Sequence, residues 1–288
     1  MKGLIVKGVA GFYYVKADGG LFRCRARGIF KKDGIAPLVG DYVEIEILND
    51  GEAVVNKIAE RKNQFIRPQI SNVDCFIVVI SASKPEPNFS VIDRFLILAE
   101  KNMADAIICV NKIDIVEKTK TDGIREIYKG VYPVACLSAL TGEGVEEFKL
   151  SLSKCKYALA GPSGAGKSTL LNALEHSASA ETGEISRKTS RGKHTTRHTE
   201  IFGAASGAMF YDTPGFTSFD ADGVEAAELQ QLYPEIEALA GKCKYRDCKH
   251  IKEKDCAVRD AVTAGRIHES RYVTYMEIYG EISQKRGF

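Results

Sequence analysis

The segment GPSGAGKST, at residues 161–169, constrains the fold of this 288-residue chain more than any other segment. It matches the pattern G-x-x-x-x-G-K-[ST] in full, and it lies between the apolar run KYALA (156–160) and a stretch with helical spacing. Glycines in such a loop let backbone N–H groups turn inward around phosphate oxygens, in front of the N-terminus of a helix. The segment therefore predicts a strand, a phosphate-binding loop and a helix within an α/β domain, rather than an ordinary glycine-rich turn.

Each position of this loop has an expected part in binding a nucleotide. We expect the Lys167 ammonium to reach the β- and γ-phosphates, and the Ser168 hydroxyl to bind Mg²⁺. The other loop residues that we expect to contact the nucleotide are Gly161, Pro162, Ser163, Gly164, Ala165, Gly166 and Thr169.

A second strand end, upstream of the loop, indicates which nucleotide is bound. Asn111, Lys112, Ile113 and Asp114 follow the apolar run ADAIICV (104–110). The Asp114 carboxylate can accept hydrogen bonds from guanine N1–H and the 2-amino group, whereas adenine has neither donor and would leave a buried carboxylate unpaired. Asn111 would hold guanine N7 and brace the loop, and the Lys112 stem would pack on the ring. Alone, these four residues are also compatible with an ordinary polar turn.

Ser138 and Ala139 complete the predicted guanine site. They follow the strand-like run YPVAC (132–136), and a backbone N–H there can donate to guanine O6. Together with the phosphate loop, they make GTP or GDP the expected ligand. The order is unusual, because the guanine-reading residues precede the phosphate loop by about fifty residues, whereas GTPases commonly have the reverse order.

The run AMFYD (208–212) leads into the expected hydrolytic side of the site. Asp212 should support Mg²⁺ through water, and the Gly215 N–H should face the γ-phosphate. Phe216 stands where many GTPases place the Gln that orients the attacking water, and a phenyl ring cannot do so. We therefore expect slow intrinsic hydrolysis unless another group or a partner supplies the polar contact.

The basic segment SRKTSRGKHTTRHT begins at Ser186 and occupies the position of switch I in GTPases. Either Thr195 or Thr196 is the candidate to close on Mg²⁺ and the γ-phosphate. The predicted magnesium ligands are Ser168, Thr196 and Asp212. His194 is the best local candidate to position water, although it is also compatible with a loop residue that touches phosphate or RNA.

Three cysteines and one histidine crowd into fourteen residues near the C-terminus: Cys243, Cys248, His250 and Cys256. Three thiolates and one imidazole suit tetrahedral Zn²⁺, and because protein groups fill all four positions, no place remains for a catalytic water. The spacing therefore predicts one structural Zn²⁺, which would stabilise a small helical domain with little core of its own.

The N-terminal part of the chain consists of short strand-like runs without a useful helical period. FYYVKADGGLFRCRAR has a hairpin signal at Asp18-Gly19, and VGDYVEIEI (39–47) alternates apolar and polar residues, as a half-buried strand does. A small barrel closes such strands without leaving exposed edges.

Positive charge is clustered, although the net charge of the chain is only +2. Arg23, Arg25 and Arg27 alternate and share one face, which is either solvated or RNA-facing. Residues 186–198 contain five Lys or Arg and no acid, and residues 242–254 contain six Lys or Arg and two acids. Such clusters are commonly solvated, but two of them beside other functional signals favour a polyanionic partner.

The whole pattern predicts three domains. They are a β-barrel at 1–66, an α/β nucleotide-binding domain at 67–220 and a helical zinc-binding domain at 221–288. In the middle domain, alternating strands and helices predict a mostly parallel sheet covered on both faces, with ligands bound past the carboxyl ends of its strands. Apolar runs such as CFIVVI (75–80) are too short to span a bilayer, and no cleavable leader pattern is present, so we expect a cytoplasmic protein.

In the order and identity of these motifs, the chain closely resembles the circularly permuted, ribosome-small-subunit-dependent GTPases of the RsgA/YjeQ/YloQ family. The resemblance covers nearly all 288 residues and depends on the N-terminal barrel, NKID at 111–114, Ser138-Ala139, GPSGAGKST at 161–169, RGKHTT at 191–196, DTPGF at 212–216 and the cysteine–histidine set.

The resemblance implies an OB-fold at the N-terminus, a circularly permuted GTPase domain and a C-terminal zinc domain. It implies GTP hydrolysis in late maturation of the small (30S) ribosomal subunit, stimulated by that subunit, with the GTP or GDP state controlling release. It further implies contacts of both outer domains with 16S rRNA, a monomeric protein, and a place for His194 in a catalytic switch I.

The permuted order has a physical consequence. The segment after DTPG, which would commonly continue into the strand CFIVVIS, is here free to run into the zinc domain, and the barrel enters where that strand begins. Both outer domains are thus attached beside the region that senses the γ-phosphate. We hypothesise that GTP fixes them in an RNA-binding arrangement and that hydrolysis loosens it.

Two other functions are compatible with parts of the sequence. An enzyme of metabolism or RNA modification that uses GTP as an energy source should have an additional catalytic constellation, and the sequence offers none outside the predicted site. A passive RNA-binding module with a vestigial nucleotide site is disfavoured by the intact Lys167, Ser168 and Asp212.

Overall fold

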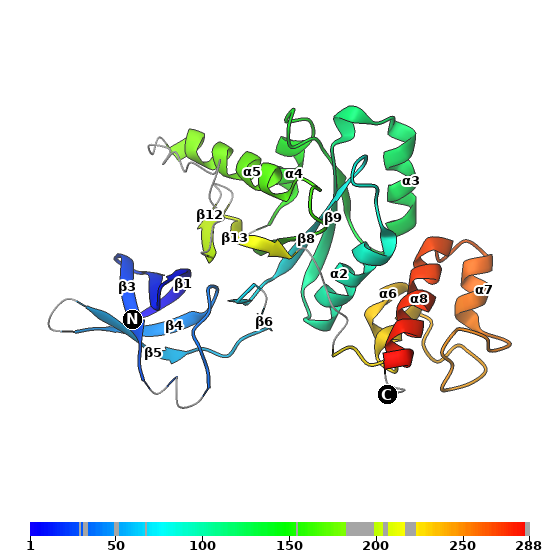
Figure 1. Cartoon of the computed structure of the whole chain (residues 1–288), viewed down its shortest axis with the longest axis horizontal. Helices are drawn as coiled ribbons and strands as arrows, with labels where there is room; N and C mark the ends of the chain where they lie inside the picture. Colours follow the sequence, from blue (N-terminus) through cyan, green and yellow to red (C-terminus); the bar gives the residue numbers. More distant parts are fainter. Residues whose placement is uncertain are drawn as a thin grey trace. The chain divides into compact units, whose positions relative to one another are not determined.

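The computed structural model (Figure 1) describes residues 1–28, 30, 34–48, 52–66, 68–153, 155–182, 199–203, 207–216 and 223–285. Its elements in chain order are β1 (Lys2–Val9), β2 (Phe12–Ala17), β3 (Gly20–Ala26), β4 (Tyr42–Ile47), β5 (Ala53–Ile58), β6 (Gln64–Phe65), β7 (Ile70–Ser71), β8 (Cys75–Ser81), α2 (Phe89–Lys101), β9 (Asp105–Asn111), η1 (Ile113–Ile115), α3 (Lys118–Tyr128), β10 (Val134–Cys136), α4 (Val145–Ser151), β11 (Lys156–Ala160), α5 (Lys167–Thr182), β12 (Thr199–Gly203), β13 (Met209–Phe216), η2 (Leu229–Leu232), α6 (Pro234–Glu237), α7 (Ala257–Thr263) and α8 (Glu269–Lys285).

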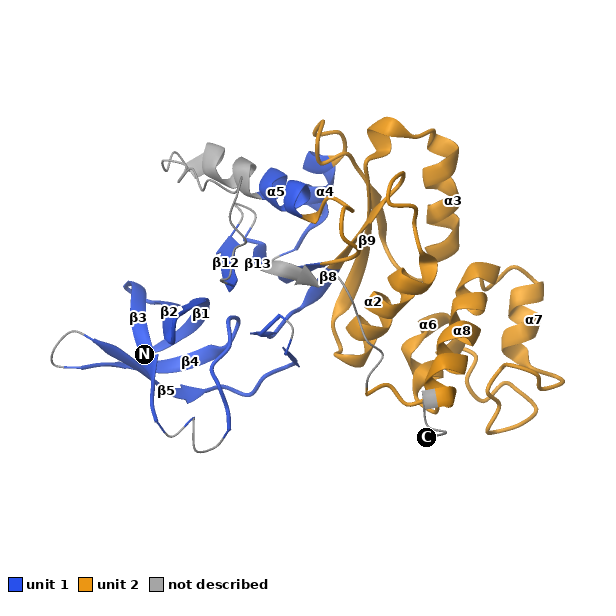
Figure 2. Cartoon of the chain, viewed as in Figure 1, with its two compact units in different colours: residues 1–76, 145–159, 168–216 blue, residues 77–144, 160–167, 217–288 orange. Residues whose placement is uncertain are grey.

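The chain forms two compact units, which Figure 2 colours separately. Unit 1 consists of residues 1–76, 145–159 and 168–216. Unit 2 consists of residues 77–144, 160–167 and 217–288. The division into domains at 1–66, 67–220 and 221–288 stays a prediction.

Within unit 1, the first five strands close into the predicted barrel. β1 pairs with β2 and β4, β2 with β3, and β5 lies between β3 and β4. The expected hairpin joins β2 to β3, with Gly19 at a φ of +96° in the left-handed region. In β4, Val43 and Ile45 are buried and Glu44 between them is exposed, so the predicted alternation is confirmed.

Unit 1 also contains a strand that the sequence did not predict. The strand order is β11-β13-β12-β1-β2-β3-β5-β4, and β12 is antiparallel to both β13 and β1. The sheet is therefore less parallel than expected. β12 has only five residues, of which Ile201 alone is buried, so its sequence contains no apolar pattern to detect. β13 continues to Phe216, past the strand end expected at Asp212.

Within unit 2, the strands follow the order β10-β9-β8, and β10 is parallel to β9. α2 buries Ile92, Phe95, Leu96 and Ala99 at the spacing of one helical face. Among the described residues, no helix combines the length and the apolar character that a bilayer crossing requires.

The C-terminal part of unit 2 is helical, as predicted, and several short elements precede its longest helix, α8. The stretch VEAAELQQLYPEIEAL forms only η2 and α6, because Pro234 starts a new helix at its first position. Gly265, at a φ of +69°, separates α7 from α8. The apolar core is larger than expected: buried residues such as Tyr233 and Tyr275 pack together with Ile97 of α2. The expectation of little core was therefore wrong, because all the buried residues of this cluster except Ile97 belong to residues 224–282 themselves.

A buried ion cluster joins α8 and α6 to α2. The Arg271 guanidinium donates to Glu235 Oε1 at 2.7 Å and to Asp93, and the side chains of Arg271 and Asp93 are 2% and 0% exposed. Tyr128 at the end of α3 donates to the same Asp93 carboxylate at 3.2 Å. Burial would lower the pKa of Arg271, but the two carboxylates raise it well above its usual value, so the guanidinium stays charged.

Arg271→Met should destabilise the protein strongly, because it leaves Asp93 and Glu235 buried without their cation. We expect the free energy of unfolding to fall by about 3–5 kcal/mol in urea titrations. Arg94→Met is the matched control, since Arg94 pairs at 2.6 Å with Glu281, whose side chain is 54% exposed. The control should lose at most about 1 kcal/mol, and equal losses in both variants would contradict the assignment.

Candidate functional site

The phosphate loop of unit 2 has a backbone that only glycine allows. Gly161 has a φ of +132°, and a Cβ there would lie 2.1 Å from the Val79 carbonyl oxygen. Gly166 has a φ of +96°, and a Cβ would lie 2.2 Å from Asn111 Nδ2. Gly164 has a φ of +78°. The loop thus packs against the end of β8 and against Asn111 with no space for side chains at its first and last glycines.

Lys167 is the first residue of α5, and its ammonium turns back over the loop. Its Nζ donates to the carbonyl oxygens of Gly161 at 2.7 Å and Pro162 at 2.8 Å. Burial lowers the pKa of Lys167. Of the other predicted contact residues, Ala165 is buried, Ser163 and Gly164 are exposed, and Ser168 and Thr169 are exposed residues of α5 that belong to unit 1.

Asn111 connects the predicted guanine site to the phosphate loop within unit 2. Its side chain is almost fully buried, and its Nδ2 donates to the Ala165 carbonyl oxygen at 3.0 Å. Its Oδ1 accepts hydrogen bonds from the backbone N–H groups of Lys112 at 2.8 Å and Ala139 at 2.9 Å. One amide side chain thus holds three loops together, and the Ala165 carbonyl takes one of the two N–H donors of its amide.

Lys112 also connects the loop after β9 to the phosphate loop. It has a φ of +67°, which is uncommon for a residue with a side chain, and such conformations cluster at binding sites. Its Nζ donates to the carbonyl oxygens of Gly164 at 2.7 Å and Lys84 at 2.6 Å. Asp114 lies in η1 with an exposed side chain, next to Ile113. Lys84 was not predicted, because it contributes a backbone carbonyl, which has no sequence signal.

The Ser138-Ala139 turn differs in one detail from the expectation. The Ser138 N–H donates to the Glu143 carbonyl oxygen at 2.9 Å, and the Ala139 N–H donates to Asn111 Oδ1. A hydrogen bond to guanine O6 would therefore be shared with, or would replace, the bond to Asn111. The O6 contact stays a prediction.

The hydrolytic residues are only partly described. Asp212 lies in β13 of unit 1, directly opposite Glu200 of β12, and Gly215 is three residues further along the same strand. His194, Thr195 and Thr196 lie outside the described residues, so their roles stay predictions.

The four predicted zinc ligands come together in unit 2. All the ligand atoms of Cys243, Cys248, His250 and Cys256 lie within 4.8 Å of one another. Cys243 Sγ is 3.5 Å from His250 Nδ1 and 3.9 Å from Cys256 Sγ. Zn–S bonds of about 2.3 Å in a tetrahedron place sulfur atoms about 3.8 Å apart, so the residues fit Zn²⁺.

Two further residues orient this centre, and neither was predicted from the sequence. Gln230 of η2 has its Oε1 3.1 Å from His250 Nε2, so it can accept a hydrogen bond and leave Nδ1 for a metal. Glu253 accepts hydrogen bonds from the backbone N–H groups of Lys249 at 2.6 Å and Ile251 at 2.9 Å. Burial raises the pKa of Glu253, but these and other backbone N–H groups lower it more, to about 2. The carboxylate is therefore ionised at neutral pH and holds the loop through these hydrogen bonds.

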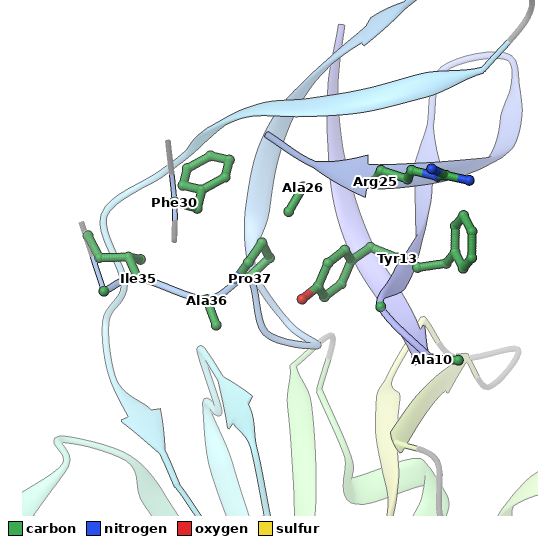
Figure 3. A pocket seen from close by; sticks show the side chains of 11 residues that line it. Ala10, Tyr13, Arg25, Ala26, Phe30, Ile35, Ala36 and Pro37 are labelled. Carbon is green, nitrogen blue, oxygen red and sulfur yellow. The ribbon is translucent and has the colours of Figure 1, made fainter. Parts of the chain in front are cut away.

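The barrel presents cations and aromatic rings on one surface. Arg23 and Arg25 are exposed, and their guanidinium carbons lie 3.7 Å and 4.9 Å from the ring centroid of Phe12. Figure 3 shows a neighbouring pocket of about 600 Å³, lined by Arg25, Tyr13 and Pro37 among other residues. Stacked guanidiniums and aromatic side chains suit RNA bases, although a solvated face stays an open alternative.

Family comparisons agree with this arrangement along the whole chain. The model of the RsgA N-terminal domain matches residues 2–55, and the RsgA GTPase model matches residues 58–222. The chain is 40% identical over 286 residues to the "Small ribosomal subunit biogenesis GTPase RsgA" of Caldanaerobacter subterraneus subsp. tengcongensis, covering 99% of this chain and 97% of the relative. It is 42% identical over 292 residues to the protein of the same name from Shouchella clausii, covering 100% and 99%.

Two solved structures resemble the chain closely. YjeQ from Thermotoga maritima has a TM-score of 0.84 at 33% identity, covering 98% of each chain. YloQ, "a circularly permuted GTPase", has a TM-score of 0.82 at 37% identity, covering 99% of this chain and 95% of that one. The predicted fold class, with its N-terminal barrel and permuted GTPase domain, is confirmed. The protein therefore belongs to the RsgA family of circularly permuted GTPases, as the order of its motifs indicated.

Proposed function

We propose that this protein acts in late maturation of the small ribosomal subunit, that the subunit stimulates its GTP hydrolysis, and that its GTP or GDP state controls its release. As a member of the RsgA GTPase family, it is a GTP-hydrolysing enzyme. Its curated relatives are named small ribosomal subunit biogenesis GTPases. The observation that best supports a working nucleotide site is the 3.0 Å hydrogen bond from Asn111 to Ala165, which joins two loops that the permuted sequence separates.

Guanine recognition is assigned to the loop that follows β9. The exposed Asp114 carboxylate accepts from guanine N1–H and the 2-amino group, and Asn111 donates its second amide N–H to N7. The Lys112 stem covers one face of the base, since its ammonium is already held across the site. The family implies a guanine nucleotide, and guanine offers the Asp114 carboxylate two donors, whereas adenine offers it neither.

Phosphate binding and hydrolysis are assigned to the loop at 161–169 and to β13. Backbone N–H groups of the loop surround the phosphates, and Lys167 exchanges its two carbonyl partners for the β- and γ-phosphates. Mg²⁺, which the family implies, would neutralise charge on the β- and γ-phosphate oxygens. Ser168, Asp212 and Thr196 or Thr195 would hold it, the Gly215 N–H would face the γ-phosphate, and His194 would position water.

The Cys243/Cys248/His250/Cys256 cluster is assigned to one structural Zn²⁺. Four protein ligands leave no open position, so the ion would cross-link the C-terminal loops and would supply no catalytic chemistry. The cluster lies among residues of the apolar core that includes Tyr275, so we infer that metal and core stabilise the same region.

The RNA partner is assigned to both outer parts of the chain. The barrel offers Arg23 and Arg25 stacked on Phe12, and the loops at 242–254 contain six Lys or Arg. We propose 16S rRNA as the ligand of both surfaces, a monomer as the active form, and the cytoplasm as the compartment. Stimulation specific to the small subunit would separate this proposal from a GTP-dependent metabolic enzyme.

Asp114→Asn should weaken GTP binding by about 10- to 100-fold, because the amide offers a donor to guanine groups that are themselves donors. The same variant should bind xanthosine triphosphate better than the wild type does, since the 2-oxo group accepts from an amide. Fluorescence titration with both nucleotides measures the change. Asp122→Asn, on the exposed surface of α3, is the control and should bind as the wild type does. An unchanged preference in Asp114→Asn would refute the guanine assignment.

Metal analysis of purified protein should find one zinc ion per chain, and Cys248→Ser should lose it together with thermal stability. Without metal, burial raises the pKa of the Cys248 thiol to about 12, so zinc must displace its proton. Zinc affinity should therefore fall as the pH is lowered from about 8 to about 6. Cys155→Ser, outside the cluster, should retain its zinc. Full zinc occupancy in Cys248→Ser would contradict the site.

GTP turnover should rise strongly when purified small ribosomal subunits are added, and large subunits alone should leave it near its intrinsic rate. The reason is that Phe216 cannot orient water, so we expect a partner to complete the site. Phosphate release over time, with equal concentrations of either subunit, measures this. Equal stimulation by both subunits, or none by the small one, would overturn the proposed function.

A further inference from the structure

One buried hydroxyl group connects the strand that contains Asp212 to β7, the short strand anchored to the barrel, and both lie in unit 1 (Figure 2). Tyr211 precedes Asp212 in β13, is 1% exposed, and donates its hydroxyl hydrogen to the backbone carbonyl of Ser71 in β7. A Cβ at Gly40 would lie 2.3 Å from the Tyr211 hydroxyl oxygen and 2.1 Å from the Ser71 carbonyl oxygen. The contact is therefore so close that position 40 has room for no side chain.

The acceptor of this bond lies in β7, after the five barrel strands, and polar contacts anchor it to the barrel. Ser71 Oγ donates to Asp41 Oδ1 at 2.6 Å, and Asp41 is fully buried. Arg61 donates to both oxygens of the same carboxylate, at 2.8 Å from Nε and 2.7 Å from Nη2. A bidentate pair of this kind fixes both partners in one geometry. Tyr211 thus contacts a segment that is anchored to the barrel rather than a loose loop.

β12 provides a second connection between the barrel and β13. Glu200 of β12 lies opposite Asp212 of β13 on one side and opposite Lys7 of β1 on the other. Lys7 Nζ is 2.6 Å from Glu200 Oε2. β12 starts at Thr199, the last residue of the predicted switch I segment. Glu200 is therefore the single residue that separates Asp212 from the barrel strand β1 across the sheet.

The strand before the phosphate loop is attached to the barrel as well. Lys156, the first residue of β11, is 4% exposed, and its Nζ donates to the Tyr42 hydroxyl at 3.1 Å. Its backbone N–H donates to Asp74 Oδ2 at 2.9 Å, and its carbonyl accepts from the Asp74 N–H at 2.9 Å. The three adjacent strands β11, β12 and β13 thus each contact the barrel or β7. β11 leads into the phosphate loop, β12 begins where the predicted switch I segment ends, and β13 contains Asp212.

Strand geometry makes the Tyr211 contact the most direct of the three. Successive side chains of a strand point to opposite faces, so Tyr211 faces the barrel while Asp212 faces the other way. A ladder cannot slip by one residue without exchanging its two faces. A movement of the barrel therefore displaces the β13 backbone at Tyr211, and with it the carboxylate of the next residue.

We propose that Tyr211 is a positioning residue, through which binding of the barrel to the small ribosomal subunit sets the placement of Asp212 for GTP hydrolysis. The inference rests on the proposed function, because it names the route by which the subunit stimulates hydrolysis. Coupling of binding equilibria is reciprocal, so the same contact makes the subunit affinity depend on the bound nucleotide.

Tyr211→Phe tests the route, because it removes the hydroxyl and keeps the ring. The ratio of GTP turnover with small subunits to turnover without them should fall by about two- to tenfold relative to the wild type. The ratio of subunit affinities in the presence of a non-hydrolysable GTP analogue and of GDP, measured by co-sedimentation, should fall toward one. Tyr157→Phe is the matched control, since the hydroxyl of this buried tyrosine of β11 is hydrogen-bonded to Ser153, and its loss should leave both ratios unchanged.

A second variant approaches the contact from the barrel. Ser71→Ala removes the 2.6 Å bond to Asp41 and loosens the carbonyl that accepts from Tyr211. If both substitutions act on one route, the stimulation ratio of the double variant should be little lower than that of the more affected single variant. Ser71→Ala alone also provides the test if Tyr211→Phe does not fold, as judged by its thermal melting curve.

The outcomes separate the inference from the proposed function. If small subunits fail to stimulate the wild type, the proposed function is wrong. If the wild type is stimulated and the folded Tyr211→Phe protein shows the same two ratios, the inference is overturned. If the two ratios fell as far in Tyr157→Phe as in Tyr211→Phe, the inference would also be overturned, because the effect would then reflect packing in general.

Discussion

The close approach of the phosphate loop to the Asn111 amide is the contact on which the nucleotide site depends. Asn111 sits at the end of β9 and reaches Ala165 across 54 residues of chain. The approach is possible because Gly166 has no Cβ, which would otherwise lie 2.2 Å from the amide nitrogen. The same amide oxygen accepts from Lys112 and Ala139. Chain order is irrelevant to this contact, which explains physically how a permuted sequence keeps a GTPase site.

Buried polar contacts fix the other parts of the molecule in a similar way. In unit 2, Arg271 of α8 is buried against Asp93 of α2 and Glu235 of α6. In unit 1, Asp41 is buried with Arg61 and Ser71. A buried charge without its partner is costly, so each cluster permits one arrangement of the elements around it. Apolar packing alone would tolerate small shifts, whereas these clusters specify which residues face each other.

The permuted connections of the chain decide which elements meet in each unit. Because the chain enters the GTPase fold at β8, the N-terminal barrel meets β11, β12 and β13 in unit 1. Because it leaves after β13, the C-terminal helices follow directly and pack against α2 in unit 2. A GTPase with conventional connections would have those chain ends elsewhere. The permuted connections thus give the N-terminal part of the chain direct contacts with β11, β12 and β13.

The sequence by itself determined the elements that depend on local chemistry. The glycine pattern at 161–169, the NKID segment, the spacing of the zinc ligands and the alternation in β4 each specify a local structure that neighbours in the chain can produce. The motif order even indicated the permutation, because loops at strand ends must converge on one edge of a parallel sheet.

Only the tertiary structure decided how distant segments meet. β12 has no apolar pattern of its own and exists because β1 and β13 flank it. The partners of Arg271, the Gln230 contact to His250 and the contact between Tyr211 and Ser71 join residues 20 to 178 positions apart. Such pairs have no sequence signal, since the free energy of a long-range polar contact depends on burial, which arises only after the chain has packed.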